Sequence, residues 1–127
     1  PSEPAPGVLR AYLRSWEDRD IDGLVRLLHD DVIFAMPPHA TWFRGAAVGA
    51  FFRSERLGRF WSQAYRILGT RANGRPALAF YVGDGDGFRR HSIQVVEFAG
   101  DRVAQVIQFI GAEYLRGFDV PERLAAA

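Results

Sequence analysis

The chain has 127 residues, of which 48% are hydrophobic and 13% aromatic, and this composition excludes a disordered chain and predicts one domain with a packed core. The formal net charge is +1, and the sixteen basic residues, all Arg, include only one adjacent pair, so the sequence lacks the basic stripe of a protein that contacts nucleic acid directly. No cysteine is present and no apolar run approaches the ~20 residues that span a bilayer, which excludes disulfides and a membrane helix and favours a cytoplasmic protein.

The first part of the chain predicts a linker followed by two helices. Residues 1–7 contain three prolines and are typical of an inter-domain linker. Apolar residues recur at helical spacing over 8–19, and Tyr12 and Trp16 lie on the same side of that helix. Asp20 fits the N-cap of a second, shorter helix that closes at 29–31.

A short strand and a third helix follow. The strand over 32–36 stops at Pro37-Pro38, because proline offers no backbone donor and fixes φ. The loop over 37–44 carries aromatic residues with a His and an Arg, a composition typical of a pocket rim or of a packing plug. Residues 46–56 then predict the third helix.

The second half of the chain changes to the period of strands. Three turn signals, of which Asn73-Gly74 is the clearest, separate the strands and predict antiparallel neighbours in a four-strand meander. Because the helices are segregated from the strands, the fold class is α+β. The predicted strands are 60–71, 77–82, 90–98 and 103–110.

The last predicted strand has apolar residues on both faces. Val103 and Ile107 lie on one face and Val106 and Ile110 on the other, whereas a sheet covered on one side alternates more cleanly. We therefore expect the helices to cover one face and another protomer or domain to cover part of the other, as in a homodimer through the sheet. A short helical piece over 113–116 precedes a C-terminal tail.

Several sequence blocks carry a resemblance to a known family. The first is SWEDRDIDGLVRLLHDDVIFAMPP, and it resembles the opening of SnoaL-like, nuclear-transport-factor-2-type domains. The others are MPPHATWFRG, TRANGRPALAFY, HSIQVVEFAGDRVAQVIQFI and GFDVP, and they resemble more narrowly the C-terminal domain of actinobacterial SigG-like extracytoplasmic-function sigma factors. The resemblance implies a cone-shaped, curved antiparallel sheet wrapped on about three N-terminal helices, with the domain over 8–121 and a tail over 122–127.

The resemblance also implies a function. Such appended domains regulate the sigma factor by packing on it or by sensing a ligand, so we expect a non-catalytic regulatory or ligand-sensing domain. Its partners would be a small apolar ligand and, if the chain is fused to them, the sigma-factor helical domains and RNA polymerase. The alternative is a stand-alone isomerase, polyketide cyclase or epoxide hydrolase that acts on an apolar cyclic molecule.

The cone fold encloses a pocket between its helices and its sheet, and the sequence offers candidates to line it. For the aromatic residues, ordinary core packing is the competing interpretation, and for Gln94 and Gln108 a structural hydrogen bond competes equally. The predicted pocket residues are Tyr12, Trp16, His39, Trp42, Arg44, Trp61, Tyr65 and Gln108.

Catalytic candidates are weak. His39 has the side chain best suited to proton transfer near neutrality, and His91 and Glu97 share one face of a predicted strand. No buried pair of acids emerges, although the related enzymes that the resemblance implies use carboxylates, and this argues against an enzyme. The three histidines lack metal-ligand spacing, and GDGDG at 83–87 lacks the later ligands of a calcium loop, so we expect no metal and no cofactor.

Overall fold

Helices occupy most of the first half and strands most of the second in the computed structural model, which describes residues 7–126. The α+β class predicted from the sequence is confirmed, and the predicted linker lies outside the described residues except for Gly7. The elements are α1 Val8–Glu17, α2 Ile21–Arg26, β1 Leu28–Ala35, β2 Trp42–Arg44, α3 Ala46–Phe52, α4 Glu55–Trp61, β3 Tyr65–Ala72, β4 Arg75–Asp84, β5 Gly87–Ala99, β6 Arg102–Ile110, α5 Ala112–Leu115 and β7 Arg123–Ala125.

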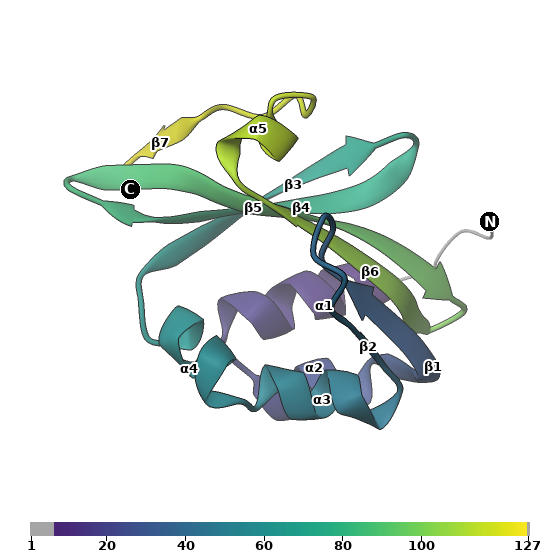
Figure 1. The fold of residues 1–127 in the computed structure, drawn as a ribbon. Helices are drawn as coiled ribbons and strands as arrows, with labels where there is room; N and C mark the ends of the chain where they lie inside the picture. The colour runs from purple at the N-terminus through teal and green to yellow at the C-terminus, as the bar shows by residue number, and fades with distance from the viewer. Residues whose placement is uncertain (1–6, 127) are drawn as a thin grey trace.

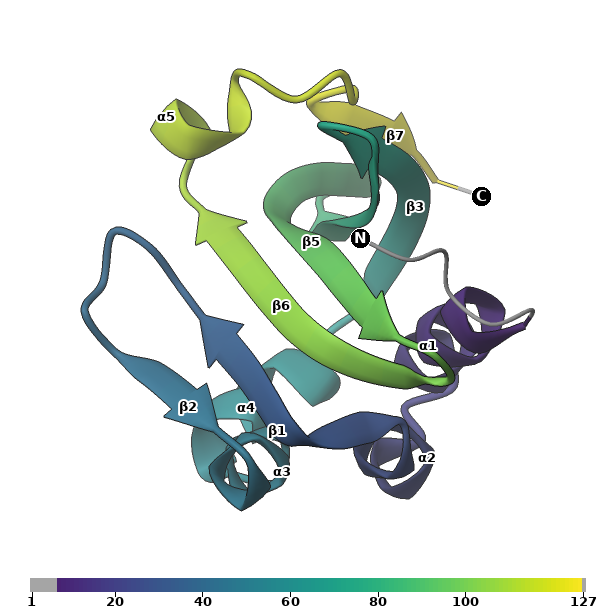
Figure 2. The same cartoon turned by 90° about the vertical axis from the view of Figure 1, so that its right-hand side faces the viewer.

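Within residues 7–126 the strands form one sheet in the order β2-β1-β6-β5-β4-β3, and β7 pairs with the start of β5. The pairs from β3 to β6 are antiparallel, as the turn signals predict, whereas β1 runs parallel to β6. The sheet is strongly curved, and α1 to α4 lie together on its concave side, while α5 and β7 lie on the other side (Figures 1 and 2). The curved sheet and the helices beneath it make the predicted cone.

Local sequence explains how the first two helices form. The apolar side of α1 buries Tyr12 and Trp16 completely or nearly so, at 0% and 2% exposure. The Asp20 carboxylate accepts a hydrogen bond of 3.0 Å from the backbone N–H of Gly23, which confirms the predicted N-cap of α2. The short connection between α1 and α2 therefore turns the chain toward β1.

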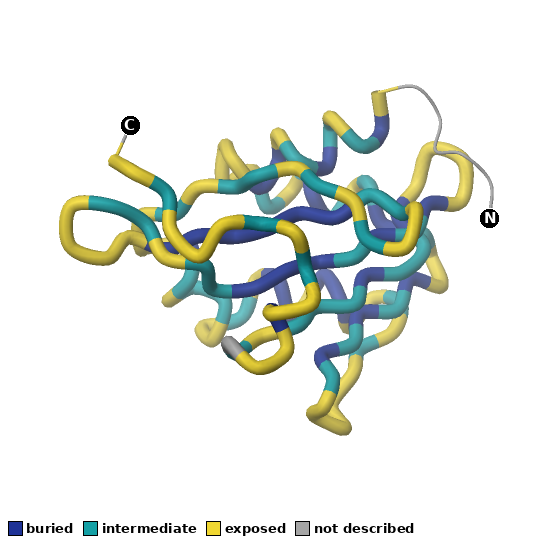
Figure 3. Tube along the Cα trace, turned by 90° about the horizontal axis from the view of Figure 1, so that it is seen from above, coloured by how far each residue is buried: buried dark blue, intermediate teal, exposed yellow. Residues whose placement is uncertain are grey.

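Buried residues form a cluster on each face of the sheet. Figure 3 shows the buried positions along the strands in the middle of the sheet. The larger cluster joins the helices to the concave face through aromatic residues such as Trp16, Phe52 and Phe80. The smaller one lies on the outer face around Tyr81 and Leu115, and the chain's own C-terminal segment, α5 to β7, covers part of it. This segment therefore buries part of the outer face of the sheet, which we expected another protomer or domain to bury. A homodimer through the sheet stays a prediction.

The predicted element boundaries differ from the structure in the first half. β1 begins at Leu28 and not at residue 32, because Leu28 already pairs with Val103 of β6. The predicted third helix is divided into α3 and α4, since Ser54 adopts an extended conformation and its hydroxyl accepts the N–H of Leu57 to begin a new helix. Phe60 and Trp61 consequently end α4 and do not begin a strand.

Two short strands were not predicted. β2 is a three-residue strand that pairs with β1 directly before α3. β7 lies in the segment predicted as a tail, where the Arg123 guanidinium pairs with the Asp84 carboxylate at 2.8 Å and fixes this segment to the end of β4. Among residues 7–126, the structure contains no helix with the length and apolarity that a membrane span requires.

Candidate functional site

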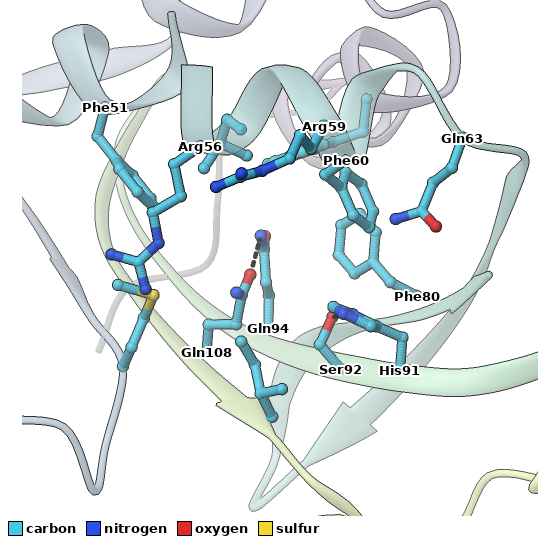
Figure 4. Close-up of a pocket in the computed structure, with 14 residues that line it drawn as sticks. Phe51, Arg56, Arg59, Phe60, Gln63, Phe80, His91, Ser92, Gln94 and Gln108 are labelled. Atoms are coloured by element: carbon cyan, nitrogen blue, oxygen red, sulfur yellow. Dashed lines mark hydrogen bonds between the residues drawn. The ribbon is translucent and has the colours of Figure 1, made fainter. Parts of the chain in front are cut away.

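A cavity of about 390 Å³ lies between α4 and the concave face of the sheet (Figure 4). Its walls are formed by apolar side chains from α1, α3, α4, β4 and β6 and from the residue after β1. Its mouth and floor are formed by polar side chains from α4, the loop after α4, β5 and β6. The apolar residues are Trp16, Met36, Phe51, Leu57, Phe60, Phe80 and Ile110, and the polar residues are Arg56, Arg59, Gln63, His91, Ser92, Gln94 and Gln108.

The floor is a chain of hydrogen bonds between uncharged groups. The hydroxyl of Tyr12 donates to Gln94 Oε1 at 2.6 Å, and Gln94 Nε2 donates to Gln108 Oε1 at 3.0 Å. Burial raises the pKa of Tyr12 strongly, against a weaker opposing effect of the Trp16 indole, so the hydroxyl keeps its proton and remains a donor. These bonds hold the two amides in place and leave the Gln108 amide nitrogen toward the cavity.

A β-bulge places two consecutive residues of β5 at the cavity. Phe80 pairs with Ser92 and Tyr81 pairs with Arg90, so His91 is the additional residue between the two pairs. The sequence predicted that His91 shares a face with Glu97 and opposes Ser92, and the bulge overturns that prediction. His91 Nδ1 lies 2.9 Å from Ser92 Oγ, and burial, assisted by Arg89, lowers the pKa of His91.

The mouth is positively charged. Arg56 and Arg59 are exposed residues of α4, and in Figure 4 Arg59 extends above the Gln94–Gln108 pair while Arg56 extends down to its left. The guanidinium of Arg56 lies 5.9 Å from the centre of the Phe51 ring, and neither arginine pairs with a carboxylate of the described residues. The cavity therefore combines apolar walls with two cations that have no carboxylate partner within residues 7–126.

Among the residues that the structure describes, no Asp or Glu lines this cavity. Glu97 forms an ion pair of 2.9 Å with Arg75, and both side chains share the outer face of the sheet with Val95 and Ala77. Glu97 is therefore separated from the cavity by the sheet. Within residues 7–126 no group of three or more His, Asp or Glu side chains could hold a metal ion.

The predicted aromatic residues of α1, α4 and β3 lie at or directly behind the cavity. Trp16 lines it, and its buried Nε1 has no hydrogen-bond acceptor. Trp61 stacks on Trp16 with ring centres 4.7 Å apart and donates to the carbonyl of Phe52, so it supports the wall from behind. The hydroxyl of Tyr65 donates to the carbonyl of Trp16, and burial raises the pKa of Tyr65 to about 12 against the opposing effect of Arg19.

The residues predicted from the loop after β1 lie elsewhere. His39 and Arg44 are exposed, and Trp42 is 56% exposed, so none of them lines the cavity. In β2 the side chains alternate, and Phe43 is the residue that turns inward, where it stacks on Phe51 with ring centres 4.4 Å apart. The sequence pattern did not reveal this alternation because β2 was predicted as a loop.

Sequence reasoning missed the arginines of α4. Arg56 and Arg59 lie one helical turn apart, and each directly precedes an apolar residue, Leu57 and Phe60, which is the spacing of an amphipathic helix. That signal was obscured because the third helix was predicted to end at Arg56 and a strand to begin at Phe60. Gln108, in contrast, was predicted for the pocket and lines it.

Three comparisons with known proteins agree with this geometry. The sequence profile of the SnoaL-like domain matches residues 9–106. The extracytoplasmic-function RNA polymerase sigma factor SigG of Mycobacterium tuberculosis is 31% identical over 123 residues, which are 97% of this chain and 33% of the sigma factor. The chain thus spans about a third of the length of the curated relatives that it matches.

Solved structures show the same fold at low sequence identity. A SnoaL-like protein of unknown function from Burkholderia thailandensis superimposes with a TM-score of 0.63 and 19% identity, over 85% of this chain and 95% of that chain. An LEH-like epoxide hydrolase of Mycobacterium tuberculosis superimposes with a TM-score of 0.59 and 16% identity, over 84% and 82% of the two chains. These similarities confirm the predicted cone fold.

Proposed function

The chain belongs to the SnoaL-like domain family, and from this premise we propose that it is a non-catalytic, ligand-sensing accessory domain of an extracytoplasmic-function sigma factor. The observation that carries the proposal is a cavity with apolar walls and an amide floor that contains no carboxylate from the described residues. The similarity to a sigma factor over almost the whole chain supports the transcriptional context.

The cavity has the properties of a binding site. Its volume of about 390 Å³ lies within the range of about 300–1,000 Å³ that is typical of small-molecule pockets. Trp16 contributes its ring to the wall, and this ring is itself held by packing against Trp61 and Phe80. The hydrogen bonds of Gln94 already hold the floor in one arrangement, which reduces the entropy cost of binding.

The same cavity is poorly equipped for the chemistry expected of the enzymes that we considered as alternatives. Isomerases of the kind expected from the family resemblance need a carboxylate base, and the predicted candidate Glu97 lies on the outer face in an ion pair. The groups that remain at the cavity are arginines, amides, a serine and a histidine. We therefore place binding before catalysis in the proposal.

One contact favours the rival enzymatic function. His91 Nδ1 lies 2.9 Å from Ser92 Oγ, and burial keeps the imidazole neutral at neutral pH, as a serine nucleophile activated by a base requires. No carboxylate of the described residues accepts a hydrogen bond from His91, so the third group of a catalytic triad is absent from residues 7–126. If the chain hydrolyses apolar esters, Ser92→Ala should abolish the turnover.

The sensing role is tested with a chimera of the M. tuberculosis sigma factor whose matching third is replaced by this chain. Leu57→Trp fills the cavity from α4, and Tyr114→Trp adds the same side chain on α5, outside the cavity. We expect promoter-dependent transcription in vitro to change after deletion of the domain and after Leu57→Trp, and to stay unchanged after Tyr114→Trp. Equal transcription from all versions would refute the regulatory role.

A further inference from the structure

The charge at the mouth of the cavity limits which ligands it can hold. Arg56 and Arg59 contribute two cations, and no Asp or Glu of the described residues lines the cavity or pairs with either arginine. Other arginines of the described residues, such as Arg53 with Asp22 at 2.7 Å, do pair with a carboxylate, whereas some exposed ones, such as Arg10, do not. Two unpaired guanidinium groups over a concave site attract an anion.

The uncharged groups of the cavity also favour an acceptor. Gln108 Oε1 is already occupied by Gln94, so the group that Gln108 presents to a ligand is the amide N–H₂, a donor. A ligand oxygen that carries negative charge would satisfy this donor and the arginines together.

The remainder of the cavity is apolar. Phe51 and Phe60 form two of its walls, with Met36 near the end of β1. A small inorganic anion would leave these surfaces in contact with water, whereas an apolar ring or chain would bury them. The ligand therefore has a charged end at α4 and an apolar body between the helix and the sheet.

We propose that this cavity binds a small organic carboxylate with an apolar ring or chain, held by Arg56, Arg59 and Gln108. The inference rests on the proposed ligand-sensing function and names its ligand class. The planar fork of a guanidinium matches the two oxygens of a carboxylate in a bidentate pair. A monoanion also suits a site where only the charged end reaches the exposed arginines and the rest of the molecule is enclosed by apolar side chains.

The test measures the binding of three probes to the 127-residue chain by isothermal titration calorimetry: 2-naphthoate, its neutral analogue 2-naphthamide, and 2-naphthyl phosphate. The three share one apolar body and differ in the charge of the polar end. We expect 2-naphthoate to bind about tenfold more tightly than the amide at low salt, which corresponds to about 1.4 kcal/mol. Raising the salt concentration should reduce this preference, because the arginines are exposed.

Matched variants locate the effect. Arg56→Gln combined with Arg59→Gln should remove the preference for the carboxylate and leave the weaker binding of the amide unchanged. Arg10→Gln removes an exposed arginine of α1 that does not line the cavity, and it should keep the preference. Circular dichroism checks that the double variant is folded, and each single variant should lose part of the preference.

Each outcome decides the proposal. A carboxylate preference that depends on Arg56 and Arg59 supports it. Equal binding of 2-naphthoate and 2-naphthamide would overturn the anion assignment but leave ligand binding by the cavity intact. Tighter binding of 2-naphthyl phosphate would overturn the carboxylate in favour of a phosphate. If none of the three probes binds, the proposal is wrong, and the transcription of the chimera then decides the sensing function separately.

Discussion

Removing one partner of the hydrogen bond between Tyr12 and Gln94 should destabilise the protein by more than the bond itself contributes to the free energy of unfolding. Both side chains are fully buried, and their oxygens lie 2.6 Å apart. Gln94→Leu keeps a similar volume but leaves the Tyr12 hydroxyl without an acceptor, and the neighbouring Trp16 N–H cannot replace it because it is a donor only. A buried unsatisfied group costs about 1–3 kcal/mol, so we expect a destabilisation of about 2 kcal/mol.

The double-mutant cycle tests this reasoning. Tyr12→Phe alone leaves Gln94 Oε1 without its donor and should cost about 1–2 kcal/mol. The double variant removes both the Tyr12 hydroxyl and Gln94 Oε1, so neither group is left without its partner. The double variant should therefore be about 1 kcal/mol more stable than the sum of the two single changes predicts. Urea denaturation followed by tryptophan fluorescence measures all four proteins, and Gln63→Leu, an exposed glutamine at the same cavity, should change stability by less than about 0.5 kcal/mol.

Strict additivity would refute the argument. It would mean that the orphaned hydroxyl of Tyr12 finds another partner, such as water that enters through the cavity. In that case the amide floor would be a hydrated surface rather than a fixed one, and Gln108 would lose its orientation toward the ligand.

Three further predictions concern pH, capping and the outer face. Burial lowers the pKa of His91, so the unfolded chain binds a proton more readily than the folded protein does. The stability contributed by the neutral, buried imidazole is complete above about pH 6.5 and is lost as the pH falls below it, so His91→Phe should flatten the pH dependence of the urea midpoint below about pH 6.5. Asp20→Ala should cost about 1 kcal/mol in urea denaturation because it removes the N-cap of α2, whereas Asp86→Ala at an exposed hairpin tip should cost nothing measurable. Leu115→Ala should cost about 2–4 kcal/mol in thermal or urea unfolding if α5 seals the outer apolar cluster, and an unchanged midpoint would show that it does not.

The cone fold could be predicted because its information is local. Asn73 and Gly74 have φ values of 52° and 77°, as the turn between β3 and β4 requires. Asn and Gly adopt positive φ more readily than other residues do, so the Asn-Gly pair predicts this turn from the sequence. The change from helical to strand period near the middle of the chain is equally visible. Together with the short connections, these signals determine an antiparallel meander beside segregated helices.

The cavity could be predicted only in part, because its geometry depends on pairing between distant segments. The bulge that turns His91 toward Ser92 arises from the register of β5 against β4, and neither strand alone contains a signal for it. The inward position of Phe43 similarly follows from its pairing with Phe34 of β1. Trp16 could be found because it shares a helical side with Tyr12.

The position of α4 explains how a ligand of this cavity could act on the rest of a larger protein. Its C-terminal end is fixed to the aromatic core, where Phe60 stacks on Tyr65 with ring centres 4.8 Å apart and Trp61 stacks on Trp16. The preceding turns carry Arg56 and Arg59 over the cavity mouth and have no charged partner within residues 7–126.

A carboxylate held by these arginines and by Gln108 would connect α4 to the sheet through contacts that the unliganded protein lacks. A ligand shifts a conformational equilibrium only by its difference in affinity for the two states. Because the arginines and the amide come from different elements, any arrangement that separates α4 from β6 would lose part of this binding energy. The ligand would therefore stabilise the arrangement of the structure, in which α4 lies against the concave face of the sheet. In the proposed sensor, the exposed side of α4 is the surface on which a neighbouring domain could detect the change.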